Sequence, residues 1–447
     1  MTGGFMMSAG RLSLLAAAGF LLAGGASAQA ADLGGNCCAD LEERIAELEA
    51  TTARKGNRKV SLTVYGQINQ ALMFWDDGAT EDNVYVVTND NSRSRFGFKG
   101  DAKIADGWKA GYTLEIGVRS ANSKRTHQDE PVGGTTDIGF DVRHSYWYID
   151  SKQLGRVSVG VTGSAAEGVT EINNAATKDI AKFSDVEDSG LGMRLISKTT
   201  GTTLPGNLQW YRLIGNTGDQ PGEGDRRNQI KYDTPEIAGF VFTAAWGTDD
   251  FWDVGVRYKG EWGDFKVAAG FAYGENTDNG GSSSINFGCP SQDPGAATDT
   301  KCSQYGGSIS VMHEPTGIYV NFAAGQLEDD LINSLGGVFA TADNKSEFFA
   351  VEAGIEKKFI PLGKTTIFGQ YYDYDGGANQ RSTVGGDEIM STGIEMWGVG
   401  VVQGLDAAAM HLYAYYRHYE GELELDTAGS VPLEDLDIVM TGAIIKF

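Results

Sequence analysis

The stretch from Lys59 to Trp75 reads KVSLTVYGQINQALMFW. Along most of it apolar side chains alternate with polar ones such as Ser61 and Thr63. The apolar side chains that share one face are Val60, Leu62, Val64, Ile68, Leu72 and Phe74. A period of two is typical of a β-strand with two different faces, whereas a helix requires a period of about 3.6. The stretch therefore predicts a strand.

The same alternation recurs over 108–118, 252–258 and 267–273. Around Tyr371 and Tyr415 both faces carry aromatic side chains, so the pattern assigns neither face there. From residue 59 to residue 447 the chain is predicted to be all-β, and about sixteen strands can be delimited. They are 59–75, 84–100, 107–119, 140–151, 155–162, 227–234, 238–247, 251–262, 264–275, 303–313, 315–325, 346–358, 363–375, 392–404, 408–420 and 436–447.

The connections between these strands indicate where the sheet lies. Those after even-numbered strands are short, and those after odd-numbered strands are mostly long. Short turns at one end, long loops at the other and an even strand number are typical of an antiparallel transmembrane β-barrel in a bacterial outer membrane. The longest connection is 163–226. Its segment 193–213 forms either a hairpin within the loop or two further crossings, which would give about eighteen strands.

The composition excludes several other classes of protein. Acidic residues outnumber basic ones 60 to 36, and the net charge of -24 disfavours binding to nucleic acid. The 4 Cys and 5 His show no metal-binding spacing, so no metal centre and no cofactor are predicted. The field of such an acidic chain predicts a preference for cations at the mouth of a channel.

Two segments precede the predicted barrel. Residues 1–30 have the charged flank, apolar core and small-residue cleavage sites of a signal peptide. Residues 31–58 are predicted to be a periplasmic helix followed by a polar linker. Leu41, Ile45 and Leu48 have the spacing of a heptad, which favours a coiled coil between copies of the chain over a single amphipathic helix.

The last seven residues, TGAIIKF, resemble the signal by which outer-membrane barrels are recognised by the barrel-assembly machinery. The matching positions are Thr441, Gly442, Ile445 and Phe447. The segments 94–100 (SRFGFKG), 143–160 and 227–235 (RNQIKYDTP) are similar to strand motifs of the Gram-negative general diffusion porins. The N-terminal helix is similar to that of the alphaproteobacterial branch.

This resemblance implies a water-filled homotrimer in the outer membrane, in which the third loop, here 163–226, folds inward and narrows the pore for small hydrophilic solutes and ions. The acids expected on that loop at the constriction are Glu167, Glu171, Asp179, Asp185, Glu187 and Asp188. The basic wall expected to face them consists of Arg93, Arg95, Arg119, Arg143 and Lys231. Facing rows of opposite charge would orient dipolar solutes. Alternatively, these groups form structural ion pairs or a solvated surface.

The outer loops carry two further candidate features. Cys289 and Cys302 lie in one long connection, which predicts a disulfide within it. Glu328, Asp329 and Asp330 either bind divalent cations that bridge lipopolysaccharide or are solvated charges.

Three alternatives to a general pore remain. A solute-selective channel would require aromatic side chains along the lumen, for which Tyr65, Trp147 and Tyr372 are candidates. A structural barrel could anchor the outer membrane to peptidoglycan through the coiled coil. An enzyme is not expected, because His127 and its acidic neighbours are accompanied by no nucleophile motif.

Overall fold

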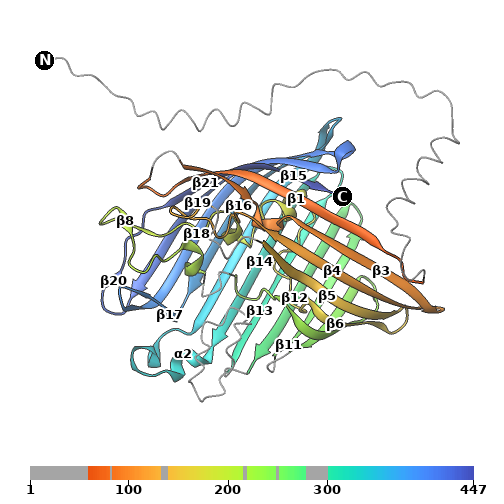
Figure 1. Cartoon of the computed structure of the whole chain (residues 1–447), viewed down its shortest axis with the longest axis horizontal. Helices are drawn as coiled ribbons and strands as arrows, with labels where there is room; N and C mark the ends of the chain where they lie inside the picture. Colours follow the sequence, from red (N-terminus) through yellow and green to blue (C-terminus); the bar gives the residue numbers. More distant parts are fainter. Residues whose placement is uncertain (1–58, 81–82, 132–138, 215–218, 248–250, 278–300) are drawn as a thin grey trace.

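The computed structural model describes residues 59–447 apart from 81–82, 132–138, 215–218, 248–250 and 278–300. Within these residues a closed antiparallel β-barrel of sixteen wall strands is formed (Figure 1), which confirms the predicted fold. The sheet closes where β1 (Thr63–Asp76) pairs with β21 (Leu436–Lys446). No helix in this part of the chain is long and apolar enough to cross a membrane.

The remaining wall strands follow one another around the barrel in chain order. They are β2 (Asn83–Thr88), β3 (Arg95–Ala105), β4 (Trp108–Arg119), β5 (Gly139–Ser151), β6 (Gly155–Gly163), β9 (Arg226–Asp233), β10 (Phe240–Gly247), β11 (Phe251–Trp262), β12 (Phe265–Asn276), β13 (Cys302–His313), β14 (Ile318–Asp329), β15 (Lys345–Ile360), β16 (Gly363–Gly376), β18 (Asp387–Leu405) and β19 (Met410–Leu425). The short strands β17 (Asn379–Val384) and β20 (Gly429–Ser430) extend loops beyond the wall, and β2 and β3 together make one wall strand.

The prediction of one continuous strand over 84–100 is wrong, because the structure interrupts it near its centre. Both β2 and β3 pair with β1, but the turn η3 (Asp90–Ser92) separates them. The side chain of Asn89 accepts a hydrogen bond from the backbone N–H of Asn91, and such local bonds compete with the strand ladder. The interruption leaves the segment 89–94 free to turn into the barrel.

The outer face of the barrel is apolar. Val64, Ile68 and Leu72 alternate along β1 and are 48%, 47% and 42% exposed on the outside. Large aromatic side chains such as Trp246 and Trp262 stand on the same face, each at the C-terminal end of its strand, and they lie at opposite rims because β10 and β11 are antiparallel. An apolar band with aromatic residues at both borders is what a lipid bilayer requires of a barrel.

The connection between β6 and β9 packs inside the barrel. It contains the turns η5 (Ala176–Asp179), η6 (Val186–Asp188) and η7 (Trp210–Leu213). It also contains a hairpin of β7 (Ile196–Ser197) and β8 (Thr202–Thr203), which forms a separate two-stranded sheet. The segment 193–213 therefore adds no wall strand, and the alternative of eighteen strands is wrong.

The apolar side chains of this loop form a core with the inner face of one half of the wall. Trp210 and Met193 are buried together with Tyr419 of β19 and Met440 of β21. This packing explains the aromatic residues on both faces near Tyr415, because the inner face of β19 meets protein rather than water.

Candidate functional site

Arg417 of β19 fixes the inner loop to the wall. Its side chain is fully buried and donates hydrogen bonds to the Ser189 hydroxyl at 2.9 Å and the Lys182 carbonyl at 2.5 Å. It also donates to the Gln370 amide oxygen on β16, at 2.9 Å. A guanidinium offers five donors in a fixed fork, so one side chain can hold several loop groups at once.

Glu352 of β15 provides a second anchor. Its fully buried carboxylate accepts hydrogen bonds from the Thr177 hydroxyl at 2.7 Å and from the amides of Gln370 at 2.6 Å and Asn321 at 3.0 Å. The hydroxyl of Ser310 on β13 accepts a bond from a backbone N–H of the same loop. The loop is thus held against β13, β15, β16 and β19, which leaves the side of the barrel formed by β3, β4 and β5 open.

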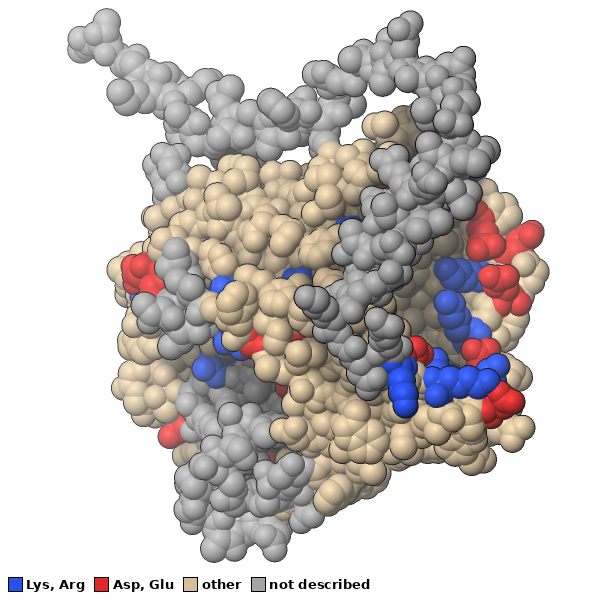
Figure 2. Space-filling model, turned by 45° about the vertical axis from the view of Figure 1, so that its right-hand side comes forward, with Lys and Arg blue, Asp and Glu red and all other residues tan. Residues whose placement is uncertain are grey.

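A polar cavity of about 850 Å³ lies between the loop and that open side. Ten acidic and nine basic side chains line it. The acids are Asp90, Glu167, Glu171, Asp179, Asp185, Glu187, Asp188, Asp219, Glu223 and Asp225, and the bases are Arg93, Arg95, Arg119, Lys124, Arg125, Arg143, Lys178, Lys182 and Arg226. On the molecule as a whole, charged side chains of both signs gather along the rim of a hollow (Figure 2).

Arginines dominate the wall side of the cavity. Arg93 and Arg119 share Asp141, at 2.6 and 3.5 Å. Arg95 and Arg143 share Glu115, at 3.7 and 2.8 Å. A third carboxylate, Glu167, has a single arginine partner, Arg226, at 2.6 Å. Five guanidinium groups therefore meet three carboxylates, and the wall keeps a positive excess.

A β-bulge in β5 increases that excess. Glu115 pairs with His144 and Ile116 pairs with Val142, so Arg143 is an extra residue in the strand. Val142 is 53% exposed on the outside, while Arg143 and His144 both face inward. Bulges commonly re-aim side chains in this way.

Carboxylates dominate the loop side. Lys182 lies between Glu171 at 2.8 Å and Asp185 at 2.5 Å. Lys124 lies 3.2 Å from Glu187 and 4.0 Å from Asp188. Lys124 is also 2.9 Å from Asp219, so two ammonium groups serve five acids of this loop.

The shortage of cations changes the pKa values of the loop acids. Burial raises the pKa of Glu171, of Glu187 and of Asp188, the last to about 7, and neighbouring carboxylates add to the effect. Burial and the charge of Asp185 raise the pKa of Glu223 to about 8. The pKa of the Asp185 carboxyl is instead lowered to about 2, because the effect of the Lys182 ammonium outweighs that of burial.

The structure places the residues expected from the sequence as follows. All six loop acids and four of the five wall bases line this cavity. Lys231 points to the inside of β9 but is not among the lining residues. Glu167 lies on the wall side with Arg226, and Asp179 forms an ion pair with Lys446 at 2.6 Å.

Sequence reasoning missed Arg226, Lys124 and Glu223. Arg226 opens β9, where alternation would place it on the outward face with Ile230 and Tyr232, so periodicity could not have found it. Lys124 and Glu223 lie in long connections, where no periodicity predicts the direction of a side chain. Two candidates for lumen aromatics are wrong, because Trp147 is 51% exposed on the outside and Tyr372 is fully buried beneath the loop.

Other expected features lie elsewhere. Glu328 is 3.7 Å from Lys345, and Asp329 caps a short helix, α2 (Asp330–Ser334). Cys302 is disulfide-bonded. Cys289 lies outside the described residues, as do residues 1–58 with Leu41, Ile45 and Leu48, so their predicted roles stay predictions.

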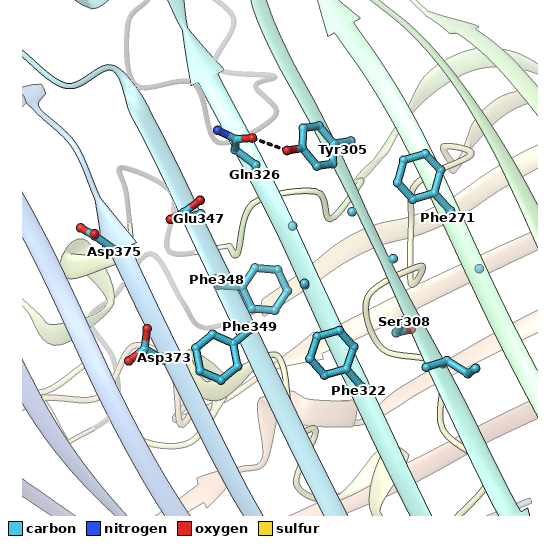
Figure 3. A pocket seen from close by; sticks show the side chains of 16 residues that line it. Phe271, Tyr305, Ser308, Phe322, Gln326, Glu347, Phe348, Phe349, Asp373 and Asp375 are labelled. Carbon is cyan, nitrogen blue, oxygen red and sulfur yellow. Dashed lines mark hydrogen bonds between the residues drawn. The ribbon is translucent and has the colours of Figure 1, made fainter.

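A second hollow, of about 720 Å³, lies on the outer surface over β12 to β16 (Figure 3). Rings of Phe271, Phe322 and Phe349 surround it, and acids such as Asp373 stand at one end. These side chains belong to the outward face of their strands, so this hollow is no part of a passage through the barrel.

A closed barrel with an apolar outside and a charged, loop-narrowed interior defines a channel of the bacterial outer membrane. The chain belongs to the Gram-negative porin family, whose model matches residues 13–429. It is an outer-membrane porin for passive diffusion.

Solved structures agree in fold. The anion-selective porin from Comamonas acidovorans is 16% identical, covers 87% of this chain and 100% of its own, and has a TM-score of 0.52. The outer membrane channel DcaP of Acinetobacter baumannii is 13% identical, covers 89% and 100%, and has a TM-score of 0.51. OmpT, an outer membrane protein of Vibrio cholerae, is 13% identical, covers 88% and 99%, and has a TM-score of 0.50. The curated proteins include no match to this chain.

Proposed function

We propose that the 850 Å³ cavity is the constriction of the pore and that it sorts solutes by a transverse electric field. The observation that carries this proposal is the separation of charge. Five arginines with three carboxylates stand on the wall, and an excess of acids stands on the loop, where Lys182 and, from the connection between β4 and β5, Lys124 are their ammonium partners. A solute that crosses such a field aligns its dipole without entering a binding pocket.

Small hydrophilic and zwitterionic solutes fit this constriction best. A zwitterion places its carboxylate toward the arginines and its ammonium toward the loop acids, whereas an apolar solute gains nothing and disturbs the ordered water. No catalytic role is proposed: His127 lies 3.5 Å from Glu130 at a loop, and no nucleophile accompanies the pair among the described residues.

Liposome swelling tests this proposal. Proteoliposomes are placed in isotonic glycine, glycerol, glucose or raffinose, and initial swelling rates are compared. We expect rates that fall steeply with size and a zwitterion that enters faster than a neutral solute of similar mass. Reversal of the wall charge, with Arg93→Glu and Arg143→Glu together, should abolish the advantage of the zwitterion. Equal rates for all solutes would contradict a narrow, charged constriction.

The partners follow from the family resemblance. We propose a homotrimer in contact with lipopolysaccharide, inserted by the barrel-assembly machinery through Gly442, Phe447 and their neighbours, with the segment 31–58 between barrel and peptidoglycan. Divalent cations at the acidic outer loops are a further part of this proposal. Crosslinking of the protein in intact cells, with and without residues 31–58, separates the barrel contacts from those of the N-terminal segment.

A further inference from the structure

A column of rings lines the wall between the constriction and the end of the barrel that carries the short turns. His144, Tyr146 and Tyr148 face the lumen in succession along β5. Their ring centroids are 5.9 Å and 6.4 Å apart, from His144 to Tyr146 and from Tyr146 to Tyr148. β5 runs from the arginine cluster toward the short turn 152–154, so the column leads away from the constriction.

Glycines on the neighbouring strands keep the flanking rings flat against the wall. The ring of Tyr148 lies over Gly111 of β4, where an added Cβ would come within 2.3 Å of its Cζ atom. The ring of Tyr65 lies over Gly97 of β3 in the same way, at 2.7 Å. Aromatic side chains that cover a glycine on a sheet leave one ring face toward the open side.

Cations stand on these ring faces. The guanidinium carbon of Arg156 is 4.3 Å from the centroid of Tyr148, and the Nζ atom of Lys99 is 5.0 Å from that of Tyr65. Contacts of this kind hold a flexible cation in a defined position at small cost. Tyr146, between the arginine cluster and Arg156, carries no such cation among the described contacts.

We propose that this column, centred on Tyr146 and flanked by Arg143 and Arg156, transiently binds ring-bearing anions during their passage. This inference rests on the proposed diffusion function and names a class of solute for it. The acidic loop pushes the anionic group of such a solute toward the arginines, and its ring then lies against Tyr146. A neutral ring uses only the stacking surface, and an anion without a ring uses only the cations. Aromatic carboxylates and sugar acids share the required chemistry.

Single-channel recording of the full-length protein tests the proposal with three probes. Benzoate has the ring and the charge, benzamide has the ring without the charge, and acetate has the charge without the ring. We expect benzoate to reduce the current at a concentration about three- to tenfold lower than benzamide or acetate requires. One aromatic contact contributes enough binding free energy for a difference of this size. For sugar acids, glucuronate and glucose are the matching pair with and without the charge. The blocking concentrations of glucuronate and benzoate, compared with each other, show which of the two classes of solute the column prefers.

Three variants assign the effect to the column. Tyr146→Leu should remove the advantage of benzoate over acetate, and Arg156→Gln should reduce its advantage over benzamide, since Arg143 remains. Tyr112→Leu, on the outward face of β4, should change neither. Equal block by benzoate and acetate in a conducting wild-type channel would overturn the proposal and leave the diffusion function intact. A folded barrel without conductance would overturn both.

Discussion

At the scale of single residues, a few buried polar groups hold the inner loop in position. Arg417 forms hydrogen bonds to both the loop and another wall strand. The substitution Arg417→Met removes its hydrogen bonds to the Lys182 carbonyl, Ser189 and Gln370. Each neutral hydrogen-bonding partner left unsatisfied in a buried site costs about 1–3 kcal/mol. We therefore expect a lower melting temperature and, because the loop loosens, a larger single-channel conductance.

The matched control is Lys358→Met, which removes a cation at a short turn. Its ion pair with Asp406 is more than half exposed, so it contributes little to stability. Melting and conductance should stay at their wild-type values. If Arg417→Met also left both unchanged, the loop would have to be held by its apolar core alone.

The raised pKa values of the loop acids predict a pH-dependent selectivity. Asp188, with a pKa of about 7, and Glu223, with a pKa of about 8, are mostly ionised at pH 9 and mostly protonated at pH 6. Acidification over this range removes negative charge from the loop while the arginines keep theirs. Reversal potentials in a salt gradient should therefore shift toward anion selectivity as the pH falls.

A substitution tests whether Glu223 contributes to this pH-dependent shift in selectivity. Glu223→Gln removes one titrating group and should shrink the change between pH 9 and pH 6. Glu328→Gln, an outward-facing acid of β14 remote from the cavity, should leave the change as it is. A selectivity that does not vary over this pH range would show that these carboxyls are not at the constriction.

At the scale of the strands, closure of the barrel depends on the contact between β1 and the end of β21. The backbone of Gly66 exchanges hydrogen bonds with that of Phe447, at 2.9 and 3.0 Å. A Cβ atom at Gly66 would lie 2.5 Å from the Phe447 ring and 2.6 Å from the Arg95 carbonyl oxygen. The substitution Gly66→Ala should destabilise the barrel by about 1–3 kcal/mol, seen as conversion to the slowly migrating unfolded form at lower temperature on electrophoresis.

Gly369 of β16 provides the control for that prediction. Its added Cβ would meet nothing closer than 3.8 Å, so Gly369→Ala should melt like the wild type. Equal melting of both variants would mean that closure between the first and last strands tolerates the extra atom.

The strands were predictable because lipid and water impose a period of two along each of them. The interruption at 90–92 was missed because the hydrogen bonds of Asn89 and Asn91 outweigh the strand preference of their neighbours. The two-sided aromatic pattern near Tyr415 could not be interpreted, since its cause is a loop more than 200 residues away. Charged residues on regular strand segments could be placed by alternation. Arg226 could not, because alternation puts it outside, and Lys124 and Glu223 could not, because contacts alone fix loop side chains.

At the scale of the whole molecule, two electrostatic effects compete. The net charge of -24 attracts cations to the mouth, while the cavity itself carries nearly equal numbers of acids and bases. Charges that line the cavity act on a passing ion at closer range than charges on the outer loops. Because the cavity charges nearly balance, the selectivity between cations and anions at neutral pH should be weak. We expect a small cation preference at pH 9, measured as a reversal potential well below the value for an ideal cation channel. A near-ideal value of either sign would contradict the balanced cavity.

The fold and the charged cavity imply that the barrel is an open, water-filled pore narrowed by its inner loop. Single-channel conductance of the purified, folded protein in a planar bilayer measures this property. An open trimeric pore should give ohmic steps that arrive in threes, with a size that rises in proportion to salt concentration and increases in Arg417→Met. A correctly folded barrel that inserts into the bilayer and yields no steps would contradict it.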